Sequence, residues 1–134
     1  MTTDESMSID VREFLRAHIA SFEELEILVF LIRNEADVTT AQIEEALPIR
    51  ASMVDAAILS LVRSSVAEEV GPNRYRYAPS TQALESTTRK LAQAYAERPV
   101  TVIKALTADA IDRLRSSAVH TFVDPAIVRK KSAE

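Results

Sequence analysis

One glycine, Gly71, is present in 134 residues, and it lies within the stretch EEVGPNRYRYAPS at residues 68–80. With so little glycine, the chain has few places for a left-handed or sharply turned backbone. The tetrapeptide Gly-Pro-Asn-Arg at 71–74 is typical of a β-turn, since proline suits the first central position and asparagine tolerates the second. The Arg-Tyr-Arg-Tyr that follows alternates, as a strand with one wet face does. We therefore predict a hairpin, with a first strand beginning at 67–70, in a chain that is otherwise helical.

Length and composition indicate an ordinary folded protein that is either one domain or one domain with a helical extension. Apolar residues make up 47% of the chain and charged residues 27%, but aromatic residues only 5%, so the core must be built from Leu, Ile, Val and Ala. The absence of cysteine excludes disulfides, thiolate metal sites and cysteine nucleophiles. The acidic start MTTDESMSID does not resemble a signal peptide, and the longest apolar run, ILVFLI, is too short to span a bilayer. We expect a soluble, cytoplasmic protein without membrane contact.

Apolar periodicity and capping residues predict a series of helices around the hairpin. Ser21 with Glu24, and Thr39 with Gln42, have the spacing of capping boxes. Ser80 is the expected cap of the helix that follows the hairpin, and the last helix is either continuous or broken near Thr107. The predicted helices are 9–20, 22–34, 40–47, 51–64, 81–97 and 100–118, with a short extended stretch at 36–38 and a tail from 119.

The helix predicted at 51–64 has two distinct faces. Its apolar residues recur at spacings of three and four, which indicates a buried side. The buried side is expected to contain Val54, Ala57, Ile58, Leu61 and Val62. A step of about 100° per residue turns the others outward: Ser52, Met53, Ala56, Leu59, Ser60 and Arg63.

This order of elements resembles the winged helix-turn-helix superfamily of bacterial transcription factors, and most closely the multiple-antibiotic-resistance regulators. The resemblance covers residues 21–78. Met53-Val54, Ala57, Leu61 and Ser65-Val66 stand at positions of the family pattern, although Ser65 replaces the usual glycine. The resemblance implies a mainly α fold with a small β-hairpin. The chain is then divided into an N-terminal extension helix (1–20), the winged domain (21–80), C-terminal helices for dimerisation (81–118) and a tail (119–134).

The resemblance implies a transcriptional regulator that binds double-stranded DNA, with the helix in the major groove and the hairpin, or wing, on the backbone. The positions expected to bind DNA are Arg50, Ser52, Met53, Ala56, Ser60, Arg63, Asn73, Arg74 and Arg76.

Two features keep an alternative open. Residues 1–48 carry eleven acidic and three basic side chains, whereas residues 49–134 carry nine and thirteen, so only the second half attracts a polyanion. The outward face of the helix at 51–64 also has few basic side chains. Its Met53, Ala56 and Leu59 suit an apolar protein partner. The alternative is therefore a winged-helix interaction module that does not bind DNA. Arg74 and Arg76 are then the solvated face of an edge strand, and Tyr75 and Tyr77 pack inward in either case.

The flanking helices have more apolar surface than the winged domain is expected to cover. A homodimer is the natural arrangement, because a two-fold axis sets two helices about one DNA turn apart. The expected interface positions are Leu84, Leu91, Tyr95, Ile103 and Leu106. The alternative is that these helices fold back within one monomer. Arg89-Lys90 and Arg129-Lys130-Lys131 are possible additions to a basic surface.

The sequence does not predict an enzyme. His18 and His120, the only histidines, have no carboxylate or second histidine at ligand spacing. We expect His18 at a helix-helix boundary and His120 in a polar loop. Adjacent acidic pairs such as Glu44-Glu45 point to different faces, and a chain with one glycine has no phosphate-binding loop. No metal and no cofactor are expected.

Overall fold

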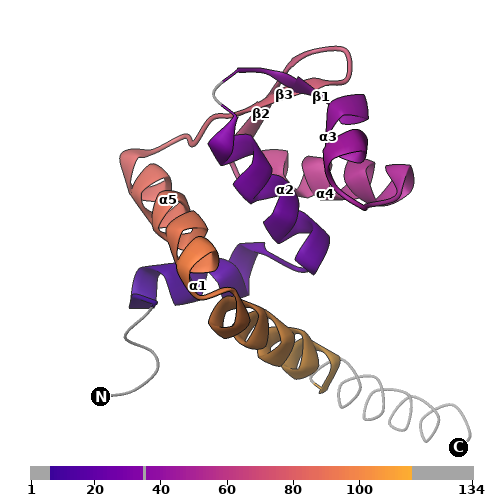
Figure 1. The fold of residues 1–134 in the computed structure, drawn as a ribbon. Helices are drawn as coiled ribbons and strands as arrows, with labels where there is room; N and C mark the ends of the chain where they lie inside the picture. The colour runs from indigo at the N-terminus through magenta and orange to yellow at the C-terminus, as the bar shows by residue number, and fades with distance from the viewer. Residues whose placement is uncertain (1–6, 35, 116–134) are drawn as a thin grey trace, which may run out of the picture.

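A computed structural model describes residues 7–34 and 36–115. These residues form a mainly helical protein with one small sheet (Figure 1). The sheet lies at one end of the molecule, α1 and the last described helix lie at the other, and α2 and α5 run between them. The elements are α1 (Ile9–His18), α2 (Phe22–Arg33), β1 (Val38–Thr39), α3 (Thr40–Ala46), α4 (Ala51–Arg63), β2 (Ala67–Gly71), β3 (Arg74–Tyr77) and α5 (Gln82–Glu97). Residues 99–115 form a further helix, called helix 99–115 below.

The sheet has three antiparallel strands in the order β1-β3-β2, so the predicted hairpin forms and the short extended stretch pairs with it. Val38 lies opposite Tyr75, and Glu68 lies opposite Arg76. The register shifts between Glu69 and Gly71, which places a bulge next to the turn. Asn73 has a φ of 57°, the positive value that the second central position of such a turn requires. The expected class, mainly α with a small hairpin, is confirmed.

A single apolar core runs through the described residues. α2 packs against α4 near the sheet, and α1 packs against α5 at the opposite end. The core contains Leu25 and Leu28 of α2, Leu61 of α4 and Leu91 of α5, together with Leu106 of helix 99–115. Its aliphatic composition follows from the scarcity of aromatic residues. None of the described helices combines the length and apolarity needed to cross a membrane.

The predicted caps are partly confirmed. Thr39 and Gln42 form a complete capping box at α3. Ser21 accepts the backbone N–H of Glu24, but the Glu24 carboxylate accepts the N–H of Ala20 instead of completing a box with Ser21. The prediction at Ser80 was wrong. Thr81, not Ser80, caps α5, because its hydroxyl accepts the N–H of Leu84. Helix 99–115 continues through Thr107 without a break, because Val102 and Leu106 on its inner side pack into the core.

The end of α4 is a Schellman motif with an unusual residue. The N–H of Val66 donates to the carbonyl of Leu61 at 3.2 Å, and the N–H of Ser65 donates to the carbonyl of Val62 at 3.0 Å. This arrangement requires the left-handed conformation at Ser65, whose φ is 66°. Glycine adopts this conformation without steric cost, whereas serine does not. Ser65 stands where the resembled family has glycine, and it adopts the backbone conformation that glycine favours.

We expect the substitution Ser65→Gly to raise the free energy of unfolding by about 0.5–1 kcal/mol, because it relieves the left-handed strain at an exposed site. Urea unfolding followed by circular dichroism measures the change. Ser65→Ala is the matched control, since it removes the hydroxyl but keeps the Cβ, and it should give no gain. Equal effects of the two substitutions would contradict the inference that the left-handed backbone at Ser65 is strained.

Two tyrosines tie α5 to the rest of the protein. The Tyr77 hydroxyl of β3 contacts the hydroxyl of Thr88, and the Arg89 guanidinium lies 5.1 Å from the centre of the Tyr77 ring. On the next turns of α5, the Tyr95 hydroxyl donates to the Glu26 carboxylate of α2. Burial, and then the hydrogen bond to Glu26 and its charge, raise the pKa of Tyr95 to about 12.

This pKa predicts a loss of stability in alkali. The folded-state pKa of about 12 lies above the ordinary value of 10.0, so the folded protein keeps the Tyr95 proton after the unfolded chain has lost it. The contribution is present in full below pH 10 and disappears between pH 10 and 12. Its size is about 1–2 kcal/mol after allowance for solvent screening. The free energy of unfolding, measured across this pH range, should fall less steeply in Tyr95→Phe than in the unmodified protein. An unchanged slope would contradict the assignment.

Helix 99–115 is fixed to α1 by polar contacts. The Arg12 guanidinium donates to both oxygens of the buried Asp109 carboxylate, at 2.9 and 3.1 Å. Arg113 donates from one nitrogen to the carbonyls of Arg16 and Ile19, at 3.1 and 3.2 Å, and so satisfies backbone groups at the end of α1. These contacts, together with the apolar core, determine which side of helix 99–115 faces outward.

Candidate nucleic-acid interface

The outward face of α4 lies where the sequence predicts it. Val54, Ala57, Ile58 and Leu61 are buried, and Val62 is half-buried against the core. Arg50, Ser52, Ala56 and Arg63 are exposed, as expected, but Ser60 is half-buried rather than fully outward. Met53 and Leu59 are exposed to 40% and 50%, so two large apolar side chains lie on this surface. The face is accessible and of mixed chemistry.

The hairpin beside α4 contributes two arginines in different states. Both Arg74 and Arg76 are exposed, as is Asn73 at the turn. Arg76 lies directly across from Glu68, and its guanidinium donates to that carboxylate at 2.7 and 3.0 Å. The pairing is a consequence of the strand register, which brings the two side chains to the same face. The two arginines are therefore not equivalent: Arg76 must exchange an ion pair before it can bind a phosphate.

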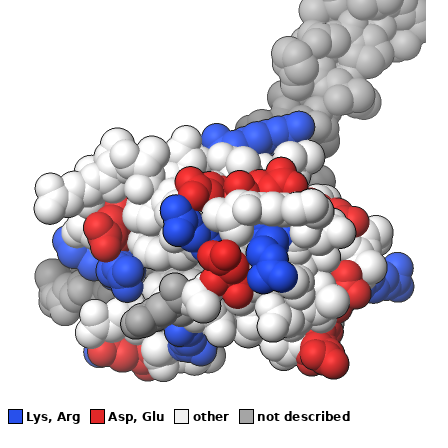
Figure 2. All heavy atoms as spheres, turned by 90° about the horizontal axis from the view of Figure 1, so that it is seen from above, with Lys and Arg blue, Asp and Glu red and all other residues white. Residues whose placement is uncertain are grey.

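Acidic groups lie close to the junction between α4 and the hairpin. Burial raises the pKa of Tyr75, and the negative charges of Glu69 and Asp55 raise it further. Asp55 belongs to α4 and Glu69 to β2, so carboxylates from both elements approach this tyrosine. The face seen in Figure 2 carries basic side chains separated by acidic and uncharged ones, with no continuous basic area. Attraction to a polyanion at this face is therefore local, not general.

Among the described residues, the other basic cluster is Arg89-Lys90 on α5. Arg89 is engaged with the Glu85 carboxylate at 3.2 Å and with the Tyr77 ring. Arg129-Lys130-Lys131 and His120 lie outside the described residues. Within the described part of the chain, the candidate interface consists of the α4 face, its start at Arg50 and the hairpin turn.

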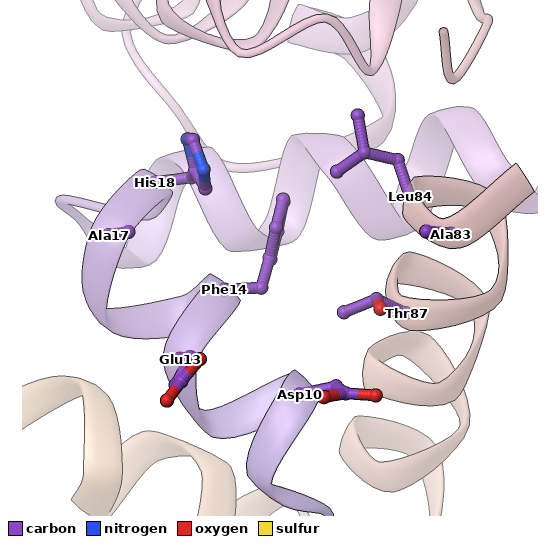
Figure 3. Close-up of a pocket in the computed structure, with 8 residues that line it drawn as sticks. All are labelled: Asp10, Glu13, Phe14, Ala17, His18, Ala83, Leu84 and Thr87. Atoms are coloured by element: carbon purple, nitrogen blue, oxygen red, sulfur yellow. The ribbon is translucent and has the colours of Figure 1, made fainter. Parts of the chain in front are cut away.

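A hollow lies between α1 and the first turns of α5 (Figure 3). This open cleft has a volume of about 400 Å³, and Phe14 and Leu84 point toward each other across it. Asp10 and His18 lie along its α1 side. His18 lies at the end of α1, and its Nδ1 lies 3.2 Å from the hydroxyl of Ser64 at the end of α4, so it lies where these two helices meet. No cluster of three metal-ligating side chains occurs among residues 7–34 and 36–115.

Comparison of the chain with protein-family models, with curated proteins and with solved structures finds no match.

Sequence reasoning missed the carboxylates that neutralise the interface. Glu68 could have been found, because pairing across a two-residue turn with one bulge brings residues 68 and 76 together. The same pairing places Glu69 opposite Tyr75. The approach of Asp55 to Tyr75 depends on how α4 packs against the sheet, for which the sequence contains no local signal. The predicted dimer positions also need correction. Leu91 and Leu106 are buried in the protomer's own core, and Leu84 and Tyr95 are half-buried against it, whereas Ile103 is exposed.

Proposed function

We propose that the chain is a winged helix-turn-helix protein that binds duplex DNA as a transcriptional regulator. α4 would enter the major groove, and the hairpin would contact the adjacent backbone. The observation that supports this most directly is the placement of an accessible α4 face beside a projecting hairpin. α3 and α4, joined by residues 47–50, form the helical pair, and the strand order β1-β3-β2 ties the hairpin to the same core.

The chemistry of the proposed interface predicts modest affinity and strong dependence on salt. Ser52 and Ser60 suit hydrogen bonds to base edges or phosphates, and Ala56 suits a thymine methyl group. Arg50, Arg63 and Arg74 are the phosphate contacts. Because Asp55 and Glu69 lie near Tyr75 of the hairpin and Glu68 is paired with Arg76, close approach of DNA is favourable only where an arginine meets a phosphate directly.

Duplex binding measured by fluorescence anisotropy over a range of salt concentrations tests this function. Three phosphate contacts per copy predict a slope of log Kd against log salt of about 2.7. A mixed-sequence duplex reports the non-specific part of binding, and selection from a random duplex pool reports specificity. Absence of salt-dependent binding to any duplex at low salt would contradict the proposal.

We further propose that two copies act together on DNA. Isologous pairing would present two α4 helices to successive turns of the duplex and double the number of contacts. Sedimentation of the complex, together with the length of the protected duplex, measures this stoichiometry. One copy per duplex at saturation would contradict it.

The exposed apolar side chains favour a second function, docking of a protein partner on α4. Met53 and Leu59 are two large apolar side chains exposed on the same helix. Exposed apolar area of this kind suits a protein partner. Under this function, the substitutions Met53→Asp and Leu59→Asp together would abolish binding of a partner. The substitution Arg74→Ala would leave it unchanged. Loss of duplex binding in both variants, with no partner affected, would favour DNA alone.

A further inference from the structure

The outward face of α4 has a central line of exposed residues. At about 100° per residue, its members fall within an arc of about 60°, on the side of the helix opposite the buried residues. The central line consists of Ser52, Ala56, Leu59 and Arg63, all of them exposed. If α4 enters the major groove, as the proposed function requires, this line is the part of the helix that reaches the base edges.

The central line lacks the side chains that read purines by hydrogen bonds. Arginine and lysine bind guanine through O6 and N7, and asparagine and glutamine bind adenine through N6 and N7. α4 contains no lysine, asparagine or glutamine, and its one arginine, Arg63, is its last residue. In the middle of the line stand Ala56 and Leu59, whose side chains neither donate nor accept hydrogen bonds. This part of α4 can therefore distinguish bases only by apolar contact.

One apolar group marks a base in the major groove. Thymine presents its C5-methyl group there, whereas cytosine, adenine and guanine present only hydrogen-bonding atoms and ring edges. Cytosine methylated at C5 presents the same group. Leu59 is exposed to 50%, so a methyl group that packs against it and against Ala56 removes apolar surface of both partners from water.

The charges of α4 match the rest of a groove. Arg50 precedes the helix and Arg63 ends it, and both are exposed, with no ion pair to any described residue. α4 has 13 residues, which is a length of about 20 Å, so the two long side chains can reach the phosphates on either side of a groove about 12 Å wide. The acidic residue Asp55 lies on the flank toward Tyr75 of the hairpin, outside the central line.

We propose that the central line of α4 recognises the C5-methyl groups of pyrimidines, so that the protein selects duplexes with these groups opposite Ala56 and Leu59. This inference rests on the proposed function and adds to it the chemical class that the site recognises. Arginine-phosphate contacts supply the sequence-independent part of binding, and methyl contacts supply the selectivity.

The preferred duplex from the random pool provides the first test. Replacing its thymines by deoxyuridine removes the methyl groups and keeps every hydrogen bond between the bases. Affinity should fall about threefold to fivefold for each methyl group in contact. The salt slope should stay the same, because no phosphate contact is lost.

A comparison of cytosine with 5-methylcytosine identifies the source of the methyl group. At each position where deoxyuridine weakens binding, a pair of 5-methylcytosine with guanine should bind more tightly than a pair of cytosine with guanine. If 5-methylcytosine also exceeds thymine at these positions, the recognised DNA is methylated on cytosine. If thymine exceeds it, the recognised DNA is rich in thymine.

A protein variant separates direct contact from an effect of the methyl groups on DNA shape. In Ala56→Ser with Leu59→Ser, replacement of thymine by deoxyuridine should no longer weaken binding. Ile9→Ser is the control, since it removes an apolar side chain of α1 that is 74% exposed and should keep the full deoxyuridine effect. The substitutions in the DNA leave the protein unchanged, so they remain decisive if a protein variant is perturbed.

The outcomes distinguish this inference from the function on which it rests. Salt-dependent binding with no preferred sequence, or with equal affinity for the thymine and deoxyuridine duplexes, would overturn methyl recognition alone. The exposed Leu59 would then belong to the protein partner considered above. An undiminished deoxyuridine effect in Ala56→Ser with Leu59→Ser would also overturn it. Absence of binding to any duplex would contradict the proposed function, and methyl recognition with it.

Discussion

Replacing Arg50 and Arg74 together by alanine is expected to weaken duplex binding about 100-fold at low salt. Both side chains are exposed beside the α4 face, and each lost phosphate contact lowers affinity about tenfold and the salt slope by about 0.9. Anisotropy titrations at several salt concentrations measure both quantities. The control is Arg98→Ala with Lys104→Ala, which changes net charge equally at the end of α5 and on helix 99–115. Equal weakening by the two double variants would mean that general charge, and not the proposed interface, governs binding.

The ion pair between Glu68 and Arg76 sharpens this test. Arg76→Ala should weaken binding less than Arg74→Ala, because Arg76 already has a carboxylate partner at 2.7 Å. Glu68→Gln should strengthen binding several-fold, because an exposed ion pair contributes only about 0–1 kcal/mol and its loss frees the guanidinium for a phosphate. If Glu68→Gln leaves both affinity and salt slope unchanged, Arg76 does not contact the duplex.

Local patterns in this chain predicted local structure well. The spacing of Val54, Ala57, Ile58 and Leu61 identifies the buried side of α4, because residues three and four apart lie on one face of any helix. The Pro-Asn turn identifies the hairpin, because only a few residue types accept a positive φ. Both predictions depend on backbone geometry that a short segment determines by itself.

Predictions that needed a packing partner were less successful. Apolar periodicity shows that Leu91 and Leu106 are covered, but not whether the same chain or another covers them; both are buried within the protomer. The exposed apolar side chains on the outer side of helix 99–115 have the same chemical character, but no described segment covers them. Distinguishing the two required the anchoring of this helix by Arg12 and Arg113, which depends on contacts nearly a hundred residues apart along the chain.

That anchoring can be tested at its most buried point. Asp109→Ala should lower the free energy of unfolding by about 2–4 kcal/mol, because it removes two charge-assisted hydrogen bonds from Arg12 and leaves a gap in a buried site. Arg12→Met should cost at least as much, since it leaves the buried carboxylate without its guanidinium. Urea unfolding at one fixed protein concentration measures both, because any association makes the apparent stability depend on protein concentration.

The double substitution Arg12→Met with Asp109→Leu separates the two physical contributions. A buried ion pair can be replaced by apolar side chains of similar volume with little net cost, because neither charge then remains to be solvated. We therefore expect the double variant to recover most of the stability lost in either single variant. If Asp109→Ala costs less than about 0.5 kcal/mol, the pair behaves as a surface ion pair. Helix 99–115 would then be held by its apolar contacts and by Arg113, and its orientation would no longer be fixed by Arg12.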